Sequence, residues 1–156
     1  MPRLSVLIHV RNHEIPLGRV LNSVLPADEF IVVDHGSQDG SLRVARQHGA
    51  RTMRAVPGVT SDAYARAARH DWVLCLLPVE SLSDELESVL FEWKESALES
   101  GLAAYNLAIH EQAQSGWKIL TPETRLVSSR RSAWKGNLPQ PAMGPTLSGH
   151  LRRFPI

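Results

Sequence analysis

The stretch Ile31-Val-Val-Asp-His-Gly-Ser-Gln-Asp-Gly-Ser41 decides the fold class. It completes a run of apolar, largely β-branched residues at 29–34 that is short enough to be a buried strand. The turn-forming residues 35–40 interrupt this run. Apolar residues then recur at helical spacing over 42–48, and Gly49 is a favourable residue to follow a helix. The stretch therefore predicts a strand, a turn and a helix in immediate succession.

The same alternation extends in both directions through the first half of the chain. We expect strands at 4–10, 51–54 and 72–77, and helices at 16–24 and 62–69. Strands that alternate with helices at this spacing indicate right-handed βαβ units and a parallel sheet. Ligands on such sheets bind beyond the carboxyl ends of the strands. The positions expected to meet a ligand are therefore 9–14, 34–40 and 77–80.

The second half has a different pattern. Ser83 is expected to begin a long helix whose apolar side includes Leu86, Leu90 and Ala97, and Gly101 is expected to end it. Three strands are expected after it, at 103–109, 117–120 and 125–128, and the Gly- and Pro-rich tail from Lys135 is expected to be mostly loop. The sheet should therefore be mixed, within a single domain 1–156 formed by the halves 1–82 and 83–156.

Composition limits the classes of function. The 156 residues carry a formal net charge of +1, which gives no reason to expect nucleic acid or an anionic membrane as the main partner. Cys75 is the one cysteine and lies in an apolar run, so it should be a buried small hydrophobe. The chain shows no signal peptide and no stretch of about 20 apolar residues, so a cytoplasmic protein is expected.

The turn after the central strand is the best candidate for a binding loop. Asp34 places a carboxylate at the end of a buried strand, and the small residues that follow allow a ligand to approach the backbone. The helix start beyond them offers amide hydrogens to an anion. A structural interpretation stays open, in which this is a plain strand-loop-helix turn with Asp39 as the helix N-cap.

Four segments in register resemble family 2 glycosyltransferases, in particular the small bacterial branch associated with lipopolysaccharide core synthesis. They are Ser5-Val-Leu-Ile8 with Asn12, the stretch 31–41, Ala45-Arg46 with Gly49-Ala50, and Asp71-Trp-Val-Leu-Cys-Leu76. A weaker similarity to the acceptor side of that family covers 123–131 and 133–136. The resemblance implies an α/β GT-A fold with a Rossmann-like mixed sheet flanked by helices.

The resemblance also implies a ligand and a site. The ligand would be a UDP-, GDP- or ADP-linked sugar, with Asp34 bound to the base. The residues that it assigns to nucleotide binding are Val10, Arg11, Asn12, Glu14, Asp34, Gly36, Ser37 and Asp39. A glycan or lipid-linked acceptor, a peripheral place at the inner membrane, and a homo-oligomer or partner transferase would be consistent with such a protein.

The sequence departs from the family where the chemistry is done. The family's Asp-x-Asp motif binds a divalent ion that neutralises the diphosphate leaving group, but here the positions are Leu77-Pro78-Val79. Glu80 remains, and we expect it to be a solvated residue before a helix. Ser61-Asp62 replaces an Arg-Asn pair, and Asn137–Gln140 replaces a His-Glu pair. No catalytic residue is therefore assigned, and no metal cofactor is expected.

Other side chains could compensate for the missing motif. His9, His13, Asp34 and His35 lie near two strand ends and would suit a transition ion better than Mg²⁺, although their spacing defines no ligand set. A phosphate could also bind without metal to basic side chains, of which the candidates are Arg11, Arg54, Arg130, Arg131 and Lys135. Trp134 is expected to be a packing residue, with stacking on an acceptor as the alternative.

Three functional hypotheses follow. In the first, the protein binds a nucleotide-sugar and could transfer the sugar with little or no help from a metal. In the second, it is a non-catalytic descendant that acts as a nucleotide-binding regulator or as the partner subunit of an active transferase. In the third, it is an α/β interaction domain whose likeness to transferases is limited to the fold.

Overall fold

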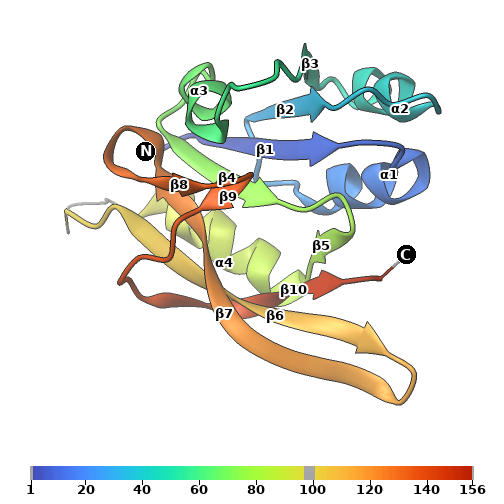
Figure 1. Ribbon diagram of the computed structural model, residues 1–156. Helices are drawn as coiled ribbons and strands as arrows, with labels where there is room; N and C mark the ends of the chain where they lie inside the picture. The colour runs from blue at the N-terminus through green and yellow to red at the C-terminus, as the bar shows by residue number, and fades with distance from the viewer. Residues whose placement is uncertain (1, 97–100, 156) are drawn as a thin grey trace.

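The structure is a computed structural model and describes residues 2–96 and 101–155. Eight of its strands form a single sheet in the order β3-β2-β1-β4-β7-β6-β10-β5 (Figure 1). In chain order these strands are β1 (Leu4–Val10), β2 (Glu29–Asp34), β3 (Arg51–Arg54), β4 (Trp72–Leu76), β5 (Glu80–Leu82), β6 (Ala104–Ala113), β7 (Gly116–Ser128) and β10 (Thr146–Arg153). A two-stranded sheet pairs β8 (Trp134–Lys135) with β9 (Leu138–Pro139).

The first half forms the predicted parallel sheet. Strand β1 lies between β2 and β4 and runs parallel to both, and β2 runs parallel to β3. Val10 stands opposite Asp34, and Asp34 stands opposite Arg54. The carboxyl ends of β1, β2 and β3 therefore meet at one edge of the sheet, which is where the sequence places its candidate binding loops.

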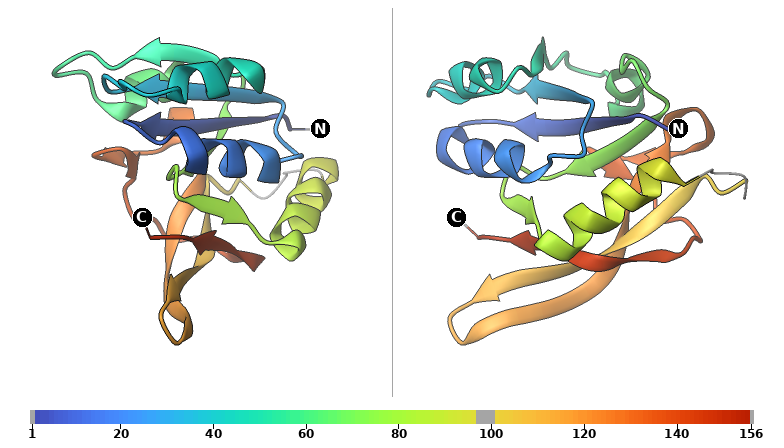
Figure 2. Two further views of the ribbon diagram at one scale, coloured as in Figure 1. Left: turned by 90° about the vertical axis from the view of Figure 1, so that its right-hand side faces the viewer. Right: turned by 180° about the vertical axis from the view of Figure 1, so that it is seen from behind.

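Helices cover the parallel strands on both faces. Helices α1 (Glu14–Ser23), α2 (Ser41–Gln47) and α4 (Asp84–Glu95) pack on one face, against the buried even-numbered residues of β1 such as Val6 and Ile8. Helix α3 (Ser61–Arg66) and the β8–β9 hairpin pack on the other face, over Leu7, Val33 and Cys75. Figure 2 shows α1 and α4 together on the side turned away from the viewer in Figure 1.

The second half makes the sheet mixed, as predicted. Strand β7 runs antiparallel to β4 and to β6, and the turn at residues 114–115 joins β6 to β7 in a long hairpin that extends away from the parallel strands (Figure 1). The prediction of two separate strands at 117–120 and 125–128 was wrong, because Gly116–Ser128 is one continuous strand. Pro122 lies within it at a place where the pairing with β6 is irregular, so the missing N–H is tolerated there.

The prediction of a loop for the tail from Lys135 was also wrong. Residues Thr146–Arg153 form β10, which pairs parallel with β6 and antiparallel with β5. The register with β6 shifts between Leu147 and His150, so the alternation of buried and exposed residues that marks a strand is broken there. Gly149 lies in this bulge with φ +88°. Strands β5, β8 and β9, with two or three residues each, were too short to predict.

The helix ends agree with the sequence in part. Ser83 caps α4 as expected, because its Oγ accepts a hydrogen bond from the backbone N–H of Leu86 at 3.2 Å. Helix α4 ends at Glu95, before the expected Gly101, and the predicted contribution of Ala97 lies outside the described residues. The N-cap position of α2 is occupied by Gly40 and not by Asp39.

Candidate nucleotide-binding cleft

Three cavities lie at the carboxyl-end edge of the parallel strands, and Asn137 of the β8–β9 hairpin lines all of them. The largest, about 550 Å³, lies between the loop after β2 and the segment 54–59 after β3. The second, about 450 Å³, lies between the start of α3 and residues 132–137. The third, about 300 Å³, lies between His9, His13 and residues 76–79 after β4. Together they form the candidate cleft.

Asp34 organises the loop on one side of the largest cavity. Its side chain is buried, and its carboxylate accepts hydrogen bonds from the backbone N–H groups of Gly36 at 3.2 Å and Ser37 at 3.2 Å. Gly36 has φ +88° and lines the cavity directly. The carboxylate therefore holds a tight turn whose backbone faces the cleft, and a conformation that favours glycine stands at its apex.

The loop after β1 is tied to this turn. The backbone N–H of Asn12 donates to Ser37 Oγ at 3.0 Å, and Asn12 Oδ1 accepts from the backbone N–H of Gln38 at 2.7 Å. Asn12 has φ +57°, a left-handed conformation that asparagine tolerates better than most residues. Val10 beside it is buried and Arg11 is exposed. The predicted residues of the two loops are thus brought together as one unit.

Glu14 and Asp39 are engaged in holding the loops. The backbone N–H of Glu14 donates to Asp39 Oδ2 at 3.1 Å, and Glu14 Oε1 pairs with Arg43 at 2.6 Å. Asp39 Oδ1 accepts from both the backbone N–H and the hydroxyl of Ser41. Both carboxylates therefore have partners within the protein. In the described part of the chain, Gly36 is the one residue of the eight predicted for nucleotide binding that lines a cavity of the cleft.

Of the residues that line the cleft, Tyr64 and Asn137 were not predicted as binding residues, and Arg54 was predicted only as a candidate phosphate contact. Arg54, Tyr64 and Asn137 line the cleft, and the backbone N–H of Val56 donates to the Tyr64 hydroxyl at 2.7 Å. Arg54 could have been assigned from the sequence, since it ends β3 beside the end of β2, but the sequence suggests it only as a phosphate contact. Asn137 carried no such signal, because the two strands of the hairpin that places it over the cleft have only two residues each.

Trp134 has the packing role that the sequence predicts. It lies against the buried cluster that includes Val33 and Cys75, beneath α3. The same residue also lines the 450 Å³ cavity. Stacking on an acceptor therefore stays a hypothesis beside the packing role.

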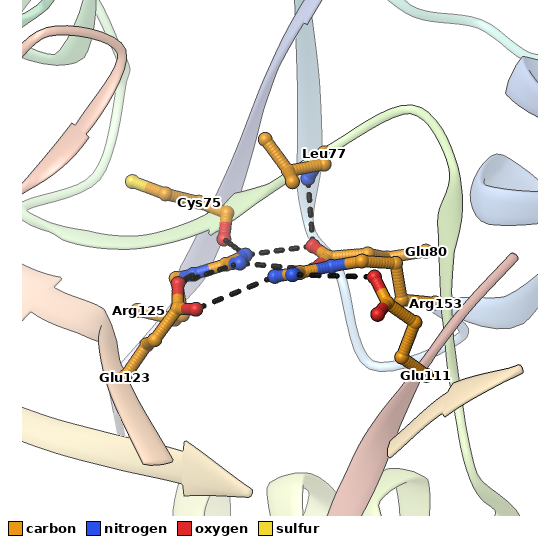
Figure 3. A network of polar contacts seen from close by, with 7 residues as sticks. All are labelled: Cys75, Leu77, Glu80, Glu111, Glu123, Arg125 and Arg153. Carbon is orange, nitrogen blue, oxygen red and sulfur yellow. Dashed lines mark hydrogen bonds and ion pairs between the residues drawn. The ribbon is translucent and has the colours of Figure 1, made fainter. Parts of the chain in front are cut away.

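Glu80 is the clearest correction at the site. It was expected to be solvated, but it is fully buried and forms a two-pronged ion pair with Arg125, at 2.7 Å from Nη1 to Oε1 and 2.9 Å from Nη2 to Oε2 (Figure 3). Glu80 Oε1 also accepts from the backbone N–H of Leu77 at 2.8 Å. The carboxylate therefore fixes the turn after β4 from inside the protein.

The ion pair is the buried centre of a larger network of ionic contacts (Figure 3). Arg153 of β10 donates to Glu80 Oε2 at 3.1 Å and lies 3.4 Å from Glu123 Oε2, and Arg125 donates to the backbone carbonyl of Cys75 at 3.1 Å. Burial opposes the charge of Arg125, yet the hydrogen bonds and charges of Glu80 and Glu123 raise its pKa above the ordinary value. The network therefore joins β4, β5, β7 and β10 below the cleft.

The donor groups at the end of β4 do not fit a hard divalent cation. Leu77, Pro78 and Val79 line the 300 Å³ cavity with side chains that carry no oxygen, and the carboxylate of Glu80 is held by two arginines. Within residues 2–96 and 101–155, no group of three or more His, Cys, Asp and Glu side chains is placed to hold a metal ion. The hypothesis of a transition-ion site at the four candidate side chains is therefore not supported by their placement.

Two of those histidines form a hydrogen-bonded chain instead. His9 Nδ1 lies 2.8 Å from His35 Nε2, and His9 Nε2 lies 2.9 Å from the buried Ser61 Oγ. The ring of Tyr64 packs edge-on against His9, with the centroids 5.8 Å apart. Burial, followed by the charge of His35, lowers the pKa of His9 to about 4. His9 is therefore neutral at pH 7 in the free protein.

Known proteins that are similar to this chain belong to the class that its sequence motifs resemble, the glycosyltransferases. No protein-family model matches the chain. It is 35% identical over 92 residues to an uncharacterised glycosyltransferase of Rickettsia typhi, and 34% identical over 92 residues to one of Rickettsia prowazekii. The chain is similar to bacterial glycosyltransferases. Each match covers 56% of the chain and 31% of the relative, so the matched part of the chain spans about a third of the length of these relatives.

Solved structures confirm the fold. Glucosyl-3-phosphoglycerate synthase of Mycobacterium tuberculosis, solved in complex with Mn²⁺, UDP and phosphoglyceric acid, superposes with a TM-score of 0.53 at 21% identity. The match covers 73% of this chain and 45% of the synthase chain. The predicted α/β GT-A fold with a mixed sheet flanked by helices is therefore confirmed.

None of the helices in the described part of the chain is both long and apolar enough to cross a membrane.

Proposed function

We propose that the chain is the nucleotide-binding part of a glycosyltransferase-like protein and that a nucleotide-sugar binds in the cleft at the carboxyl ends of β1, β2 and β4. The observation that carries this proposal is the 550 Å³ cavity between the Asp34 turn and the segment after β3. A cavity of this size suits a nucleoside, and it lies where ligands bind on open α/β sheets.

Asp34 is the residue proposed to recognise the base. Its two carboxylate oxygens already accept from the backbone N–H groups of Gly36 and Ser37, but a carboxylate has about four acceptor positions, which is more than these contacts use. An imide or amide N–H of a base could donate to the remaining positions. Arg54 lines the cavity beside the Asp34 turn and supplies a fixed positive charge for a phosphate.

Calorimetry with UDP-, GDP- and ADP-glucose tests the proposal, with and without Mn²⁺. We expect one of the three to bind, and Asp34→Asn to weaken that binding at least about tenfold, because an amide replaces one acceptor oxygen with a donor. Asp84→Asn, an exposed change in the first turn of α4, serves as the matched control and should bind normally. Absence of binding to all three ligands would overturn the proposal.

The turn after β4 supports a second proposal, which concerns the absence of catalysis. We propose that the chain binds its ligand without transferring the sugar, because residues 77–79 have no oxygen ligand for a metal and the Glu80 carboxylate is committed to two arginines. The measurement is the release of nucleoside diphosphate from the ligand that binds. Release that Asp34→Asn abolishes would contradict this second proposal and leave the first intact.

A further inference from the structure

The His9–His35 pair occupies a particular place in the cleft. His9 lines the 300 Å³ cavity beside Leu77 and Val79, and His35 lines the 550 Å³ cavity proposed for the nucleoside. Because the two rings are hydrogen-bonded to each other, the pair lies between the cavity proposed for the nucleoside and the cavity at the end of β4. In a nucleotide-sugar the diphosphate joins the nucleoside to the sugar, so a ligand with its nucleoside in the first cavity and its sugar near the end of β4 would have its diphosphate beside the pair.

The chain of hydrogen bonds fixes how many protons the pair can hold. A neutral imidazole has one N–H donor and one acceptor nitrogen, and the two ring nitrogens of His9 contact Ser61 and His35. Nδ1 of His9 and Nε2 of His35 therefore share a single proton. Adding one further proton makes the pair a hydrogen-bonded imidazole–imidazolium with one positive charge, in which the outer nitrogen of exposed His35 carries a hydrogen and is a donor whichever tautomer the neutral pair has.

We propose that the singly protonated His9–His35 pair binds the diphosphate of the nucleotide-sugar, in the role that a divalent cation would otherwise fill. This inference rests on the proposed function of the cleft. It gives the site a positive charge at the end of β4 without any carboxylate at residues 77–79. It also makes binding depend on the uptake of a proton, which a metal-bound diphosphate would not require.

The groups around the His9–His35 pair determine whether binding of the diphosphate favours or opposes its protonation. Tyr64 and Ser61 of α3 contact His9. His13 lines the same cavity as His9. The other charged side chains that line the cleft are Arg54, Asp62 and Arg66. Burial, followed by the charge of His35, lowers the pKa of His9 to about 4, so His9 carries no charge at pH 7 in the free protein. The two negative charges of a bound diphosphate act in the opposite direction and raise the pKa of the pair.

The test is calorimetry of UDP-glucose binding in the presence of a chelator, between about pH 5.5 and 8.5. UDP-glucose is the suitable probe because its diphosphate diester does not itself titrate in this range. Runs in two buffers with different ionisation enthalpies report the protons taken up. We expect the uptake of close to one proton near pH 7, and a fall in affinity of roughly tenfold per pH unit above the pKa of the pair in the complex.

Variants separate the pair from other histidines. His35→Gln keeps a hydrogen-bonding group on an exposed loop residue but cannot be protonated, so it should abolish the proton uptake and flatten the pH profile; His9→Gln should do the same. The matched control is His110→Gln. It alters a second histidine pair, His110 and His150, whose rings stack with centroids 3.8 Å apart on β6 and β10, and the proton uptake should remain.

Uridine distinguishes failure of this inference from failure of the proposed function. Uridine lacks the diphosphate, so it should bind without proton uptake and respond weakly to His35→Gln. If UDP-glucose binds but takes up no proton, or if Mn²⁺ is needed for its binding, the inference is overturned while the nucleotide site stands. If neither uridine nor UDP-glucose binds to the wild-type chain, and GDP- and ADP-glucose also fail, both proposals are overturned.

Discussion

The guanidinium of Arg125 is fully buried in the middle of the sheet, where a charge is tolerated only if its partners are correctly placed. Glu80 meets it with both oxygens, and the same carboxylate holds the backbone of Leu77. The shape of the cleft after β4 thus depends on a pair that has no access to ligand. The Glu80 carboxylate is thus held by arginines and a backbone N–H, and it is not free to bind a metal at residues 77–79.

Replacement of Glu80 alone should be severe. Glu80→Leu leaves the charge of Arg125 buried without its main partner, and we expect a loss of about 3–5 kcal/mol in the free energy of unfolding. Urea denaturation measures this loss. The double variant Glu80→Leu/Arg125→Met removes both charges and should be more stable than Glu80→Leu alone. A double variant that is less stable than the single one would show that Arg125 is held mainly by its other contacts.

Leu77 and Val79 stand at the two positions where the resembled family has the carboxylates of its Asp-x-Asp motif. Leu77 and Val79 are both partly exposed, so Leu77→Asp/Val79→Asp introduces two carboxylates at the end of β4 without burying a charge. We expect the variant to bind UDP-glucose more tightly in Mn²⁺ than in chelator, by at least about tenfold. Leu77→Asn/Val79→Asn is the matched uncharged control. Equal affinity of the Asp variant with and without Mn²⁺ would mean that the cleft does not place a diphosphate there.

At the scale of elements, the sequence predicts the strands that carry a regular pattern and misses those that do not. Strands β1, β2 and β4 are continuous apolar runs, and the loops after them are the loops that the structure brings together. Strand β10 was missed because its bulge at Gly149 interrupts the alternation, and because its partner β6 precedes it by a long segment. Local pattern carries no information about such distant pairing.

Gly149 is the point where β10 meets helix α4. A Cβ added there would lie 2.4 Å from the backbone nitrogen of Leu86, and the residue has φ +88°. Gly149→Ala should therefore lower the free energy of unfolding by more than about 2 kcal/mol. Gly49→Ala is the matched control, since Gly49 has φ +75° but nothing within 4 Å of an added Cβ. Equal losses in the two variants would show that the close approach to α4 relaxes at no cost.

For the molecule as a whole, the sequence predicts the position of the cleft better than its chemistry. The Asp34 turn was predicted from its pattern, and the structure places it at the edge of a cavity. The contact of His9 with His35 and the burial of Glu80 depend on which side chains from distant segments meet. Neither could be inferred from spacing along the chain.

The stability of the whole chain should depend on pH through His9. Its pKa is lowered from 6.5 to about 4 in the folded state, so the unfolded chain binds the proton first as the pH falls. Stability is therefore complete above about pH 6.5 and is lost progressively toward pH 4, by about 2–3 kcal/mol. Urea denaturation at a series of pH values measures this loss.

His9→Gln provides the comparison for that pH dependence. The variant should lose most of the slope between about pH 6.5 and 4.5, although it starts from a different stability. Burial would raise the pKa values of Asp28 and Asp71, but hydrogen bonds to their carboxylates lower them below the usual range, so these groups act at lower pH. An unchanged slope in His9→Gln would contradict the assignment of the effect to this residue.

The position of β10 between β6 and β5 has a consequence for folding of the chain during its synthesis. A chain that emerges from a ribosome delivers β5 and α4 long before β10, which supplies the pairing partner of β5 and Arg153 for Glu80. Until then, the parallel half can form but Glu80 lacks one of its two arginines and β6 presents an unpaired edge. The sheet should therefore complete its assembly only after β10 has left the ribosomal tunnel, and until then the exposed edge of β6 makes the nascent chain prone to aggregation.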